Sequence, residues 1–408
     1  MNIDSNRLWS SLMDLAKIGA TPKGGVRRLA LTELDGEARD LFIRWCKAAG
    51  CTVSVDGIGN IFARRAGKDD SLSPVITGSH IDTQPSGGKF DGNYGVMSGL
   101  EVIRTLNDNR IQTQAPIEVA VWTNEEGSRF TPVMMGSGCF IGAFALESTL
   151  QQKDLEGISV GDALNKIGYA GPANIGGRPV GAYFEAHIEQ GPILEDTQKV
   201  LGVVTGALGL RWYDAVVTGQ DAHAGPTPMR LRHDALVAAA NMVTEINALA
   251  YRYQPDGRGT VGFMQVKPNS RNVIPGEVRF SVDLRHANDA QLEKMESEMR
   301  AQCAELAQAQ SVSVSIERVA NYPACRFDEG CVSSVRNAAQ KLGLSHMDIV
   351  SGAGHDAIYM ARIAPTSMIF VPCEGGISHN EIENAKPEDL AAGCNVLLEV
   401  ILERAGVV

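Results

Sequence analysis

Apolar residues follow two different periods along the first 200 residues and again near the end of the chain. Some stretches place them at helical spacing, and others are short apolar or alternating runs typical of strands. Helices are predicted over 39–50, 93–108, 328–343 and 387–405, and strands over 73–80, 115–124 and 366–373. Because strands and helices alternate, these parts of the chain predict a layered α/β domain.

The middle of the chain has a different order of elements. The pattern predicts strands over 210–219, 259–266, 276–285 and 311–319, with helices over 229–250 and 289–309. This βαββαβ order is the split βαβ arrangement, a small sheet with two helices on one face. We therefore expect residues 1–209 and 321–408 to form one domain, and residues 210–320 to be inserted into it.

Composition narrows the classes of function. The chain has 408 residues, is 44% hydrophobic and carries a formal net charge of −11. An acidic chain without Lys/Arg blocks is a poor candidate for binding nucleic acid or an anionic membrane. Eight scattered cysteines without CxxC spacing indicate reduced thiols. Because the sequence shows neither a signal peptide nor an apolar run of about 18 residues, it predicts a cytoplasmic protein without a membrane span.

Histidines and carboxylates cluster where predicted strands end. The candidates are His80, Asp82, Asp91, Glu125, Glu126, His187 and His379. Ligands of open α/β sheets collect outside the carboxyl ends of the strands, so four separate segments would direct these side chains into one crevice. Glycines at positions 87, 88 and 92 would let the loop that carries Asp91 turn back over the site.

The chemistry of this set indicates metal binding. Imidazole and carboxylate groups together suit Zn, Mn, Co or Ni better than Ca or Mg. Three histidines with one Asp and one Glu exceed the usual three protein ligands of a single catalytic zinc, whereas two cations bridged by one carboxylate would use all five. Of the adjacent Glu125 and Glu126, one can bind metal while its neighbour moves protons. We interpret His233, His286 and His346 as ordinary hydrogen-bonded histidines.

Other catalytic motifs fail or are missing. The stretch GISVG over 157–161 matches GxSxG but lacks the buried strand that a nucleophile elbow needs, so we expect Ser159 to start a helix. No HExxH, GxxxxGK[ST] or GxGxxG motif occurs, which disfavours zincin, P-loop and dinucleotide-binding proteins.

Eight segments, in order along nearly the whole chain, resemble the amidohydrolase branch of the binuclear M20-type metallopeptidase family. They are GSHIDTQPSGGKFDGNYGV, NEEGSRF, HIEQGPILE, AHAGPTPM, SRNVIPG, SVDLR, SGAGHD and GISHNE. That branch includes N-carbamoyl-L-amino acid hydrolases, bacterial-type β-ureidopropionases and allantoate amidohydrolases. The resemblance implies an aminopeptidase-like α/β/α metal-binding domain, with the inserted βαββαβ (ferredoxin-like) domain as a lid and dimerisation domain.

The resemblance also implies the two metal sites. His80, Asp91 and His187 would hold one divalent cation, and Asp91, Glu126 and His379 would hold the other, with Asp91 as the bridge. The identity of the two cations per subunit remains open among Zn, Mn, Co and Ni.

Two further residues receive catalytic roles from the resemblance. Glu125 would be the general base that passes a proton from water to the leaving nitrogen. Asp82 would hydrogen-bond His80 and fix its tautomer.

Substrate contacts are implied in both domains. His223 would stabilise the tetrahedral oxyanion, and Asn272 and Arg285 would clamp the substrate carboxylate. Gln190 would bind the ureido amide, and Gly354 would offer a backbone contact. In the family some lid residues complete the partner subunit's site, so the resemblance implies a homodimer.

The activity implied is hydrolysis of the ureido C–N bond of a small N-carbamoyl amino acid, L-α or β, to the amino acid, ammonia and CO2. Allantoate or another ureido acid is the alternative substrate. An aminopeptidase fits less well, because a carboxylate clamp does not suit a peptide chain. A non-catalytic metal-binding protein is disfavoured because both Glu125 and Asp91 are present.

Overall fold

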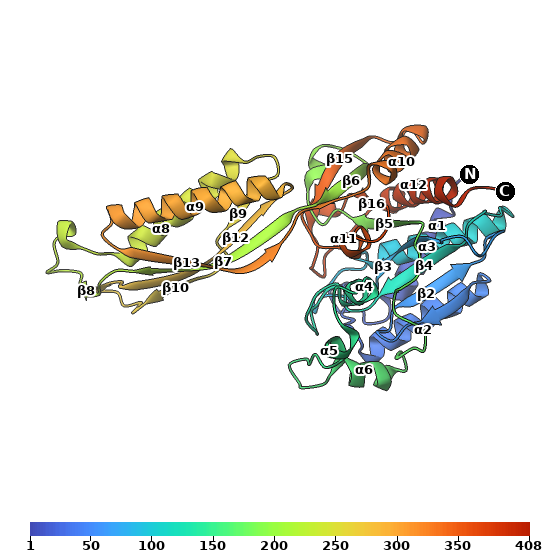
Figure 1. The fold of residues 1–408 in the computed structure, drawn as a ribbon, viewed down its shortest axis with the longest axis horizontal. Coiled ribbons are helices and arrows are strands. Elements are labelled where there is room, and N and C mark those ends of the chain that lie inside the picture. Colours follow the sequence, from blue (N-terminus) through green and yellow to red (C-terminus); the bar gives the residue numbers. More distant parts are fainter. The chain divides into compact units, whose positions relative to one another are not determined.

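The computed structural model describes residues 1–408 and divides them into two compact units. Residues 1–205 and 326–408 form the main unit, and residues 206–325 form the inserted unit. In Figure 1 the main unit contains both the blue and the red ends of the chain, whereas the inserted unit runs from green to orange.

A nine-stranded sheet forms the centre of the main unit, in the order β1-β2-β4-β3-β5-β16-β6-β14, with β15 also paired to β6. The strands are β1 (Thr52–Val55), β2 (Ile61–Arg65), β3 (Val75–His80), β4 (Ile117–Trp122), β5 (Ala182–Ile188), β6 (Leu201–Ala207), β14 (Cys325–Arg326), β15 (His346–Ser351) and β16 (Thr366–Val371). The neighbouring strands β4, β3, β5 and β16 run parallel, and every residue in them is buried. Strands covered on both faces read as continuous apolar runs, which explains the pattern in the sequence.

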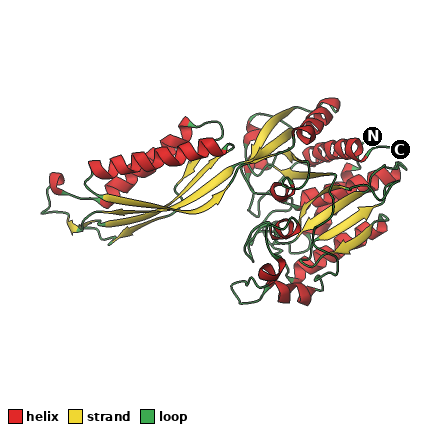
Figure 2. Cartoon of the chain, viewed as in Figure 1, coloured by secondary structure: helices red, strands yellow, loops and turns green.

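Helices surround this sheet (Figure 2). They are α1 (Ser5–Ala16), α2 (Glu33–Ala48), α3 (Asn93–Asp108), α4 (Met135–Phe140), α5 (Leu146–Leu150), α6 (Val160–Ile167), α7 (Ile193–Asp196), α10 (Glu329–Lys341), α11 (Asp356–Met360) and α12 (Pro387–Ala405). Four of these helices have an N-cap residue whose side chain accepts a backbone N–H of the first turn. These N-cap residues are Asp4, Thr32, Ser159 and Asp328. Ser159 therefore starts a helix, as predicted, and does not sit on a nucleophile elbow.

The inserted unit contains a five-stranded sheet in the order β10-β12-β7-β13, with β9 also paired to β12. Its elements are β7 (Gly209–Thr218), β8 (Ala222–His223), α8 (Ala235–Arg252), β9 (Arg258–Thr260), β10 (Met264–Lys267), β11 (Val273–Ile274), β12 (Glu277–His286), α9 (Asp289–Ala309) and β13 (Ser313–Tyr322). Buried residues of β7, β12, α8 and α9 form one hydrophobic core, so the two helices cover one face of the sheet. The mixed α/β fold class is confirmed.

Two predicted elements of the inserted unit differ from the structure by more than a shift of up to three residues at an end. The helix expected from residue 229 begins at Ala235, because the Asp234 carboxylate accepts the N–H groups of Leu236 and Val237 and so caps the helix there. The strand expected over 259–266 is interrupted between β9 and β10.

Histidines and cysteines outside the strand-end cluster have ordinary structural surroundings. Nδ1 of His233 lies 2.8 Å from the Ser311 carbonyl, and Nδ1 of His346 lies 2.8 Å from the Leu344 carbonyl. His286 is buried and accepts the Asn288 N–H. All eight cysteines are free thiols, and seven of them are buried. No helix combines the length and apolar character that crossing a bilayer requires.

Candidate metal centre

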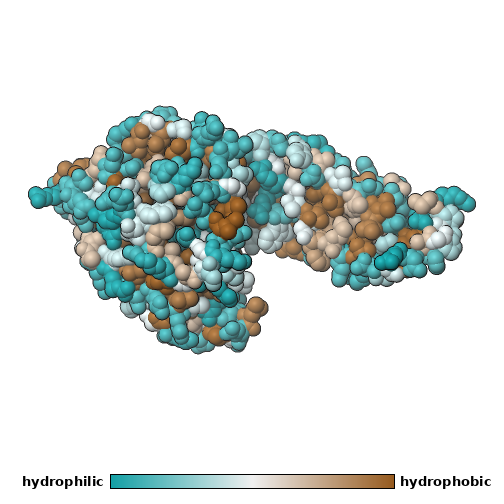
Figure 3. Space-filling view, turned by 180° about the vertical axis from the view of Figure 1, so that it is seen from behind, coloured by the Kyte–Doolittle hydropathy of each residue, from teal (hydrophilic) through white to brown (hydrophobic).

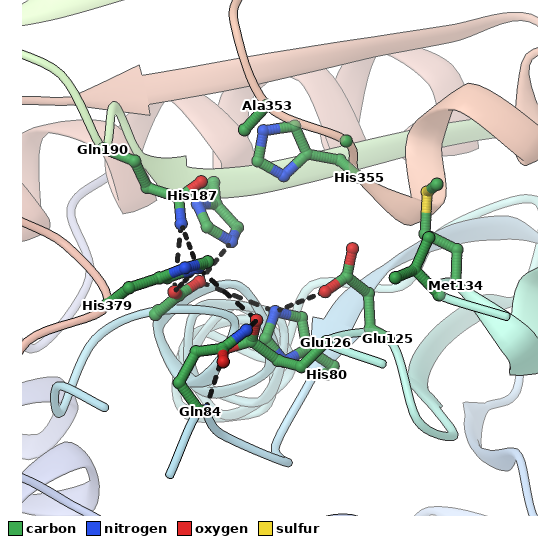
Figure 4. Close-up of a pocket in the computed structure, with 13 residues that line it drawn as sticks. His80, Gln84, Glu125, Glu126, Met134, His187, Gln190, Ala353, His355 and His379 are labelled. Atoms are coloured by element: carbon green, nitrogen blue, oxygen red, sulfur yellow. Dashed lines mark hydrogen bonds and ion pairs between the residues drawn. The ribbon is translucent and has the colours of Figure 1, made fainter. Parts of the chain in front are cut away.

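The candidate metal ligands lie at the carboxyl ends of the four parallel strands. His80 is the last residue of β3, and His187 is the next-to-last residue of β5. Glu126 follows the end of β4, and His379 follows β16. Since these four strands are neighbours in the sheet, their ends bring together side chains that are up to 300 positions apart in the sequence, as Figure 4 shows.

Asp91 is the centre of the cluster. Its Oδ1 lies 3.3 Å from Nε2 of His187 and 3.6 Å from Nε2 of His80, and its Oδ2 lies 3.3 Å from Nε2 of His379. Oε2 of Glu126 lies 3.4 Å from the same nitrogen of His379. The carboxylate of Asp91 therefore presents one oxygen to each of two ligand groups.

These groups fit two cations. The potential ligand atoms of His80, Asp91 and His187 all lie within 4.8 Å of one another, and the same holds for Asp91, Glu126 and His379. Imidazole nitrogens and carboxylate oxygens are donors that Zn, Mn, Co and Ni accept. A carboxylate shared by two compact donor sets is the arrangement that a pair of bridged cations needs.

Glycines allow the Asp91 loop to approach the strand ends. Gly92 has a φ of +66°, and a Cβ at this position would lie 2.4 Å from the ring of His80. A Cβ at Gly88 would lie 2.0 Å from the carboxylate of Glu383. The backbone of Gly92 adopts a conformation that favours glycine, and the absence of a side chain at both positions leaves room for the His80 ring and the Glu383 carboxylate.

Burial and hydrogen bonding shift the acid–base equilibria of the centre. Burial alone would raise the pKa of Asp91, but hydrogen bonds to His187, His379 and His80 outweigh it and hold that pKa well below the usual value. The hydrogen bond with Asp91 raises the pKa of His379 to about 9. Burial raises the pKa of Glu126 to about 7, with the negative charge of Asp91 adding to the shift.

Glu125 points into the same pocket but belongs to neither ligand group. Its Oε2 lies 3.4 Å from Nε2 of His80, and its side chain is buried. Burial raises its pKa well above the usual value, which the charge of His80 only partly offsets. A buried carboxylate with a raised pKa and a position beside the metal ligands is suited to accept and return a proton.

Asp82 departs from its predicted contact. The backbone carbonyl of Asp82, rather than its carboxylate, is the group near Nδ1 of His80, at 2.9 Å, while the carboxylate oxygen lies 3.9 Å away. The carboxylate instead accepts the N–H groups of Glu125 and Glu126, each at 3.3 Å. The carbonyl can therefore hold the Nδ1–H tautomer of His80, and the side chain fixes the turn after β4.

Sequence reasoning missed two residues that hold the ligands in place. The side-chain amide of Gln84 donates to Oε2 of Glu126 at 2.6 Å, and its backbone N–H donates to the other carboxylate oxygen at 3.1 Å. Glu383 accepts the N–H groups of Phe90 and Asp91 at 3.0 and 3.2 Å. Neither residue ends a predicted strand, and only the proximity of Gln84 to His80 and of Glu383 to His379 in the sequence could have indicated them.

A third compact group, Glu185, His187 and His355, is less suited to metal. The carboxylate of Glu185 already accepts hydrogen bonds from Ser79 Oγ, Tyr183 Oη and the Ala357 N–H, at 2.6, 3.2 and 3.0 Å. The ring of His355 packs edge-on against His187, with centroids 4.5 Å apart. Burial and the charge of His187 hold the pKa of His355 well below its usual value.

Gln190 and Gly354 line the pocket formed by these residues. The side-chain amide of Gln190 donates to Oδ2 of Asp91 at 3.0 Å. The cavity has a volume of about 160 Å³, below the ~300–1,000 Å³ common for small-molecule sites, so it suits a compact substrate. Its lining contains three carboxylates and no Lys or Arg.

The other three predicted substrate residues belong to the inserted unit. His223 pairs with Val273 across the β8–β11 ribbon, next to Asn272, whose carbonyl accepts the Ala224 N–H. Arg285 lies near the far end of β12 and forms an ion pair with Asp283 at 2.8 Å. The ribbon adjoins the first residues of β12, where a Cβ at Gly276 would lie 2.5 Å from Asp221. At the usual rise per residue of a strand, Arg285 is therefore roughly 26 Å from the ribbon. A single inserted unit does not bring Arg285 close to His223 and Asn272.

The fold is that of a mixed α/β hydrolase, and the candidate metal ligands lie at the ends of its strands. Residues 76–403 match the peptidase family M20/M25/M40, and the chain belongs to this metal-dependent family. The resemblance inferred from the motifs is confirmed.

Relatives within the family are similar over nearly their full length. An N-carbamoyl-L-amino-acid amidohydrolase from Rhizobium meliloti is 49% identical over 406 residues, which cover 100% of this chain and 98% of the relative. An allantoate amidohydrolase from Bacillus subtilis is 33% identical over 393 residues, which cover 96% of this chain and 95% of the relative. The crystal structure of an amidase of the hydantoinase/carbamoylase family from Burkholderia multivorans is similar to this chain with a TM-score of 0.97 and 57% sequence identity. The match covers 99% of this chain and 98% of that one.

Proposed function

We propose that the protein is a metal-dependent amidohydrolase that cleaves the ureido C–N bond of an N-carbamoyl amino acid to give the amino acid, ammonia and CO2. The carboxylate of Asp91, shared by two ligand groups with Glu125 beside them, is the observation that carries this proposal. The N-carbamoyl-L-amino-acid amidohydrolase from Rhizobium meliloti supports the substrate class. The allantoate amidohydrolase from Bacillus subtilis keeps allantoate as the alternative substrate.

Two divalent cations would complete the centre. His80, Asp91 and His187 would hold the first, and Asp91, Glu126 and His379 would hold the second, with Zn, Mn, Co or Ni as the candidate ions. When bound, such ions supply Lewis-acid chemistry, which polarises a carbonyl group and makes water acidic enough to attack at neutral pH.

The protein's own residues would then move the proton and bind the substrate. Glu125 would take a proton from the attacking water and return it to the departing nitrogen, for which its raised pKa is suited. Asp82 would keep Glu125 and Glu126 in place through their N–H groups. Gln190 would bind the ureido amide, and the backbone of Gly354 would contact the substrate.

The substrate carboxylate needs a cationic partner from outside this pocket. The lining carries Asp91, Glu125 and Glu126 and no basic side chain other than histidine. We assign this role to Arg285 with Asn272, and the stabilisation of the oxyanion to His223. Since Arg285 lies roughly 26 Å from the ribbon that carries the other two, one copy of the inserted unit cannot place all three on one small substrate.

A homodimer would resolve this separation, because each site would receive residues from both subunits. The inserted unit has features of a contact surface for a second copy. β10 is an edge strand with unpaired backbone groups on one side, and Phe263 and Met264 expose hydrophobic side chains there. Figure 3 shows hydrophobic patches on this unit, in the right-hand part of the view.

The free thiols fit a cytoplasmic location.

The Glu125→Gln variant tests the role of the base. We expect elemental analysis to find both cations retained, while the turnover number falls by about 10²- to 10⁴-fold. Near-normal turnover would show that Glu125 is not the base.

A substrate screen tests the reaction class. Ammonia release is measured for chelated and metal-reloaded protein with N-carbamoyl-L-α-amino acids, N-carbamoyl-β-alanine and allantoate. We expect release only after reloading. Absence of release from every ureido acid would overturn the proposed function.

A further inference from the structure

One wall of the pocket is apolar. Of the thirteen lining residues, nine are polar or charged, and the remaining four are Val133, Met134, Ala353 and Gly354. Figure 4 shows Met134 beside Glu125, whereas Gln190 lies on the other side of the pocket. A molecule bound among these residues therefore meets hydrogen-bonding groups over most of the pocket, and hydrocarbon and thioether where Met134 lies.

The two segments of this wall are in contact. A Cβ at Gly354 would lie 3.3 Å from Cε of Met134 and 3.6 Å from its Sδ, so the thioether lies over the backbone of residue 354. Met134 is buried, with 8% of its surface exposed, whereas Val133 is 41% exposed. Met134 thus forms the inner part of the wall, and Val133 forms its rim.

Hydrogen bonds fix the wall relative to Glu125. The N–H of Met134 donates to the carbonyl of Glu125 at 2.8 Å. The side-chain amide of Asn124 donates to the carbonyls of Phe130 and Pro132, at 2.8 and 3.3 Å. The segment before Met134 is therefore tied to the end of β4, and these hydrogen bonds place the wall beside the candidate base.

We propose that Met134 and Val133 bind the side chain of the substrate, and that this side chain is uncharged and apolar. This inference rests on the proposed function and specifies its substrate as an N-carbamoyl α-amino acid with an aliphatic, thioether or aromatic side chain. A flexible thioether adapts to such groups of different shape. The second ureido group of allantoate, or the carboxylate of carbamoyl-aspartate, would lose hydration against this wall without gaining a hydrogen bond. N-carbamoyl-β-alanine would leave the wall uncovered.

Specificity constants of the metal-loaded enzyme test the assignment. The substrates are N-carbamoyl derivatives of L-methionine, L-leucine, glycine, L-aspartate and β-alanine, together with allantoate. We expect kcat/KM for carbamoyl-methionine to exceed that for carbamoyl-glycine by at least about 10-fold, the lower end of the discrimination that one methylene gives in a hydrophobic pocket. Preference for allantoate or for carbamoyl-β-alanine would overturn this inference while leaving the amidohydrolase function intact. No turnover of any ureido acid would instead refute the proposed function.

Variants of the wall give a second, independent readout. In Met134→Ala and in the equally long Met134→Gln, the ratio of kcat/KM for carbamoyl-methionine to that for carbamoyl-glycine should fall by at least about 10-fold. The fraction of active protein cancels in this ratio, so partial misfolding does not imitate the effect. Val133→Thr, which keeps the shape of the side chain, should lower the ratio less. Ile363→Ala, at an exposed apolar position outside the pocket, should leave the ratio unchanged. A ratio that stays constant in all wall variants would overturn the assignment.

Discussion

Asp91 contacts three histidines with its two carboxylate oxygens, and residues outside the two candidate ligand groups orient it. Glu383 accepts two backbone N–H groups of the Asp91 loop. Its second oxygen accepts the hydroxyl of Ser378 at 2.8 Å, and Ser378 also lies 3.3 Å from Oδ2 of Asp91. Because Ser378 precedes His379, Glu383 joins the loop of the shared carboxylate to the loop of the last histidine.

Removing this connection should weaken the centre. In Glu383→Ala, three donors lose their acceptor in a buried place, and we expect the affinity for the cation near His379 to fall by at least about 10-fold, since residues that orient ligands are usually worth 10- to 100-fold. Titration of the cation-free protein with Zn²⁺ measures this affinity without recourse to activity. Glu383→Gln keeps an acceptor oxygen of the same reach and should bind nearly as the wild type. Equal affinities in both variants would exclude the positioning role.

Gly92 leaves no room for a side chain beside the ring of His80. In Gly92→Ala, the new Cβ would lie 2.4 Å from the ring of His80 at a φ of +66°. We expect the cation between His80 and His187 to be lost, with a fall in the free energy of unfolding of more than about 1 kcal/mol. Gly142→Ala is the matched control, since Gly142 has a φ of +80° with no atom within 4 Å. If chemical denaturation and elemental analysis gave the same result for both, the steric argument would be wrong.

The strands and helices that position the centre could be predicted because their patterns are strong. Apolar runs marked β3 and β16, and α3 and α12 have the bounds that the periodicity predicts. The shared position of the candidate ligands at strand ends followed from the parallel pairing of the strands. The contacts of Asp82, Gln84 and Glu383 could not be predicted, because a hydrogen bond between two loops leaves no periodic signal. The start of α8 was placed too early because its capping residue lies inside an amphipathic stretch.

We expect the loop after β16 to make metal binding depend on pH. Its His379 has a pKa raised to about 9, chiefly by the hydrogen bond with Asp91, so in the cation-free protein the ring is protonated at pH 7. A cation needs the neutral imidazole and must displace that proton. We therefore expect affinity to rise with pH up to about 9 and to weaken as the pH falls. Calorimetry at pH 7 in buffers of different ionisation enthalpy should detect proton release, and binding without release would contradict this prediction.

The two units divide the proposed work between them. The main unit contains every candidate metal ligand and the candidate base, whereas His223, Asn272 and Arg285 belong to the inserted unit. Under the proposed roles, the separation of roughly 26 Å along β12 would require at least one of these residues to act on a different substrate molecule or in a different subunit. An isologous dimer places the same surface of each chain against the other, so residues can be exchanged in both directions.

Mixing two inactive variants decides whether His223 acts in the partner's site. Glu125→Gln lacks the base, and His223→Ala lacks the proposed oxyanion donor, so each homodimer should be nearly inactive. In a mixed dimer, the chain with intact Glu125 receives His223 from its partner, and one of the two sites is complete. With random exchange of subunits, about half of the dimers are mixed, and activity should recover to roughly a quarter of the wild type.

The controls separate this recovery from other effects. Glu125→Gln mixed with Asp91→Asn places both lesions in the main unit, so every site lacks one essential group and no recovery is expected. If His223 instead served the site of its own chain, the first mixture would stay inactive as well. Sedimentation measurements on the same samples establish whether dimers are present, and co-purification of an untagged variant with a tagged one establishes whether subunits exchange. Ammonia release that rises only in the Glu125→Gln and His223→Ala mixture would therefore mean that a complete site takes residues from both subunits.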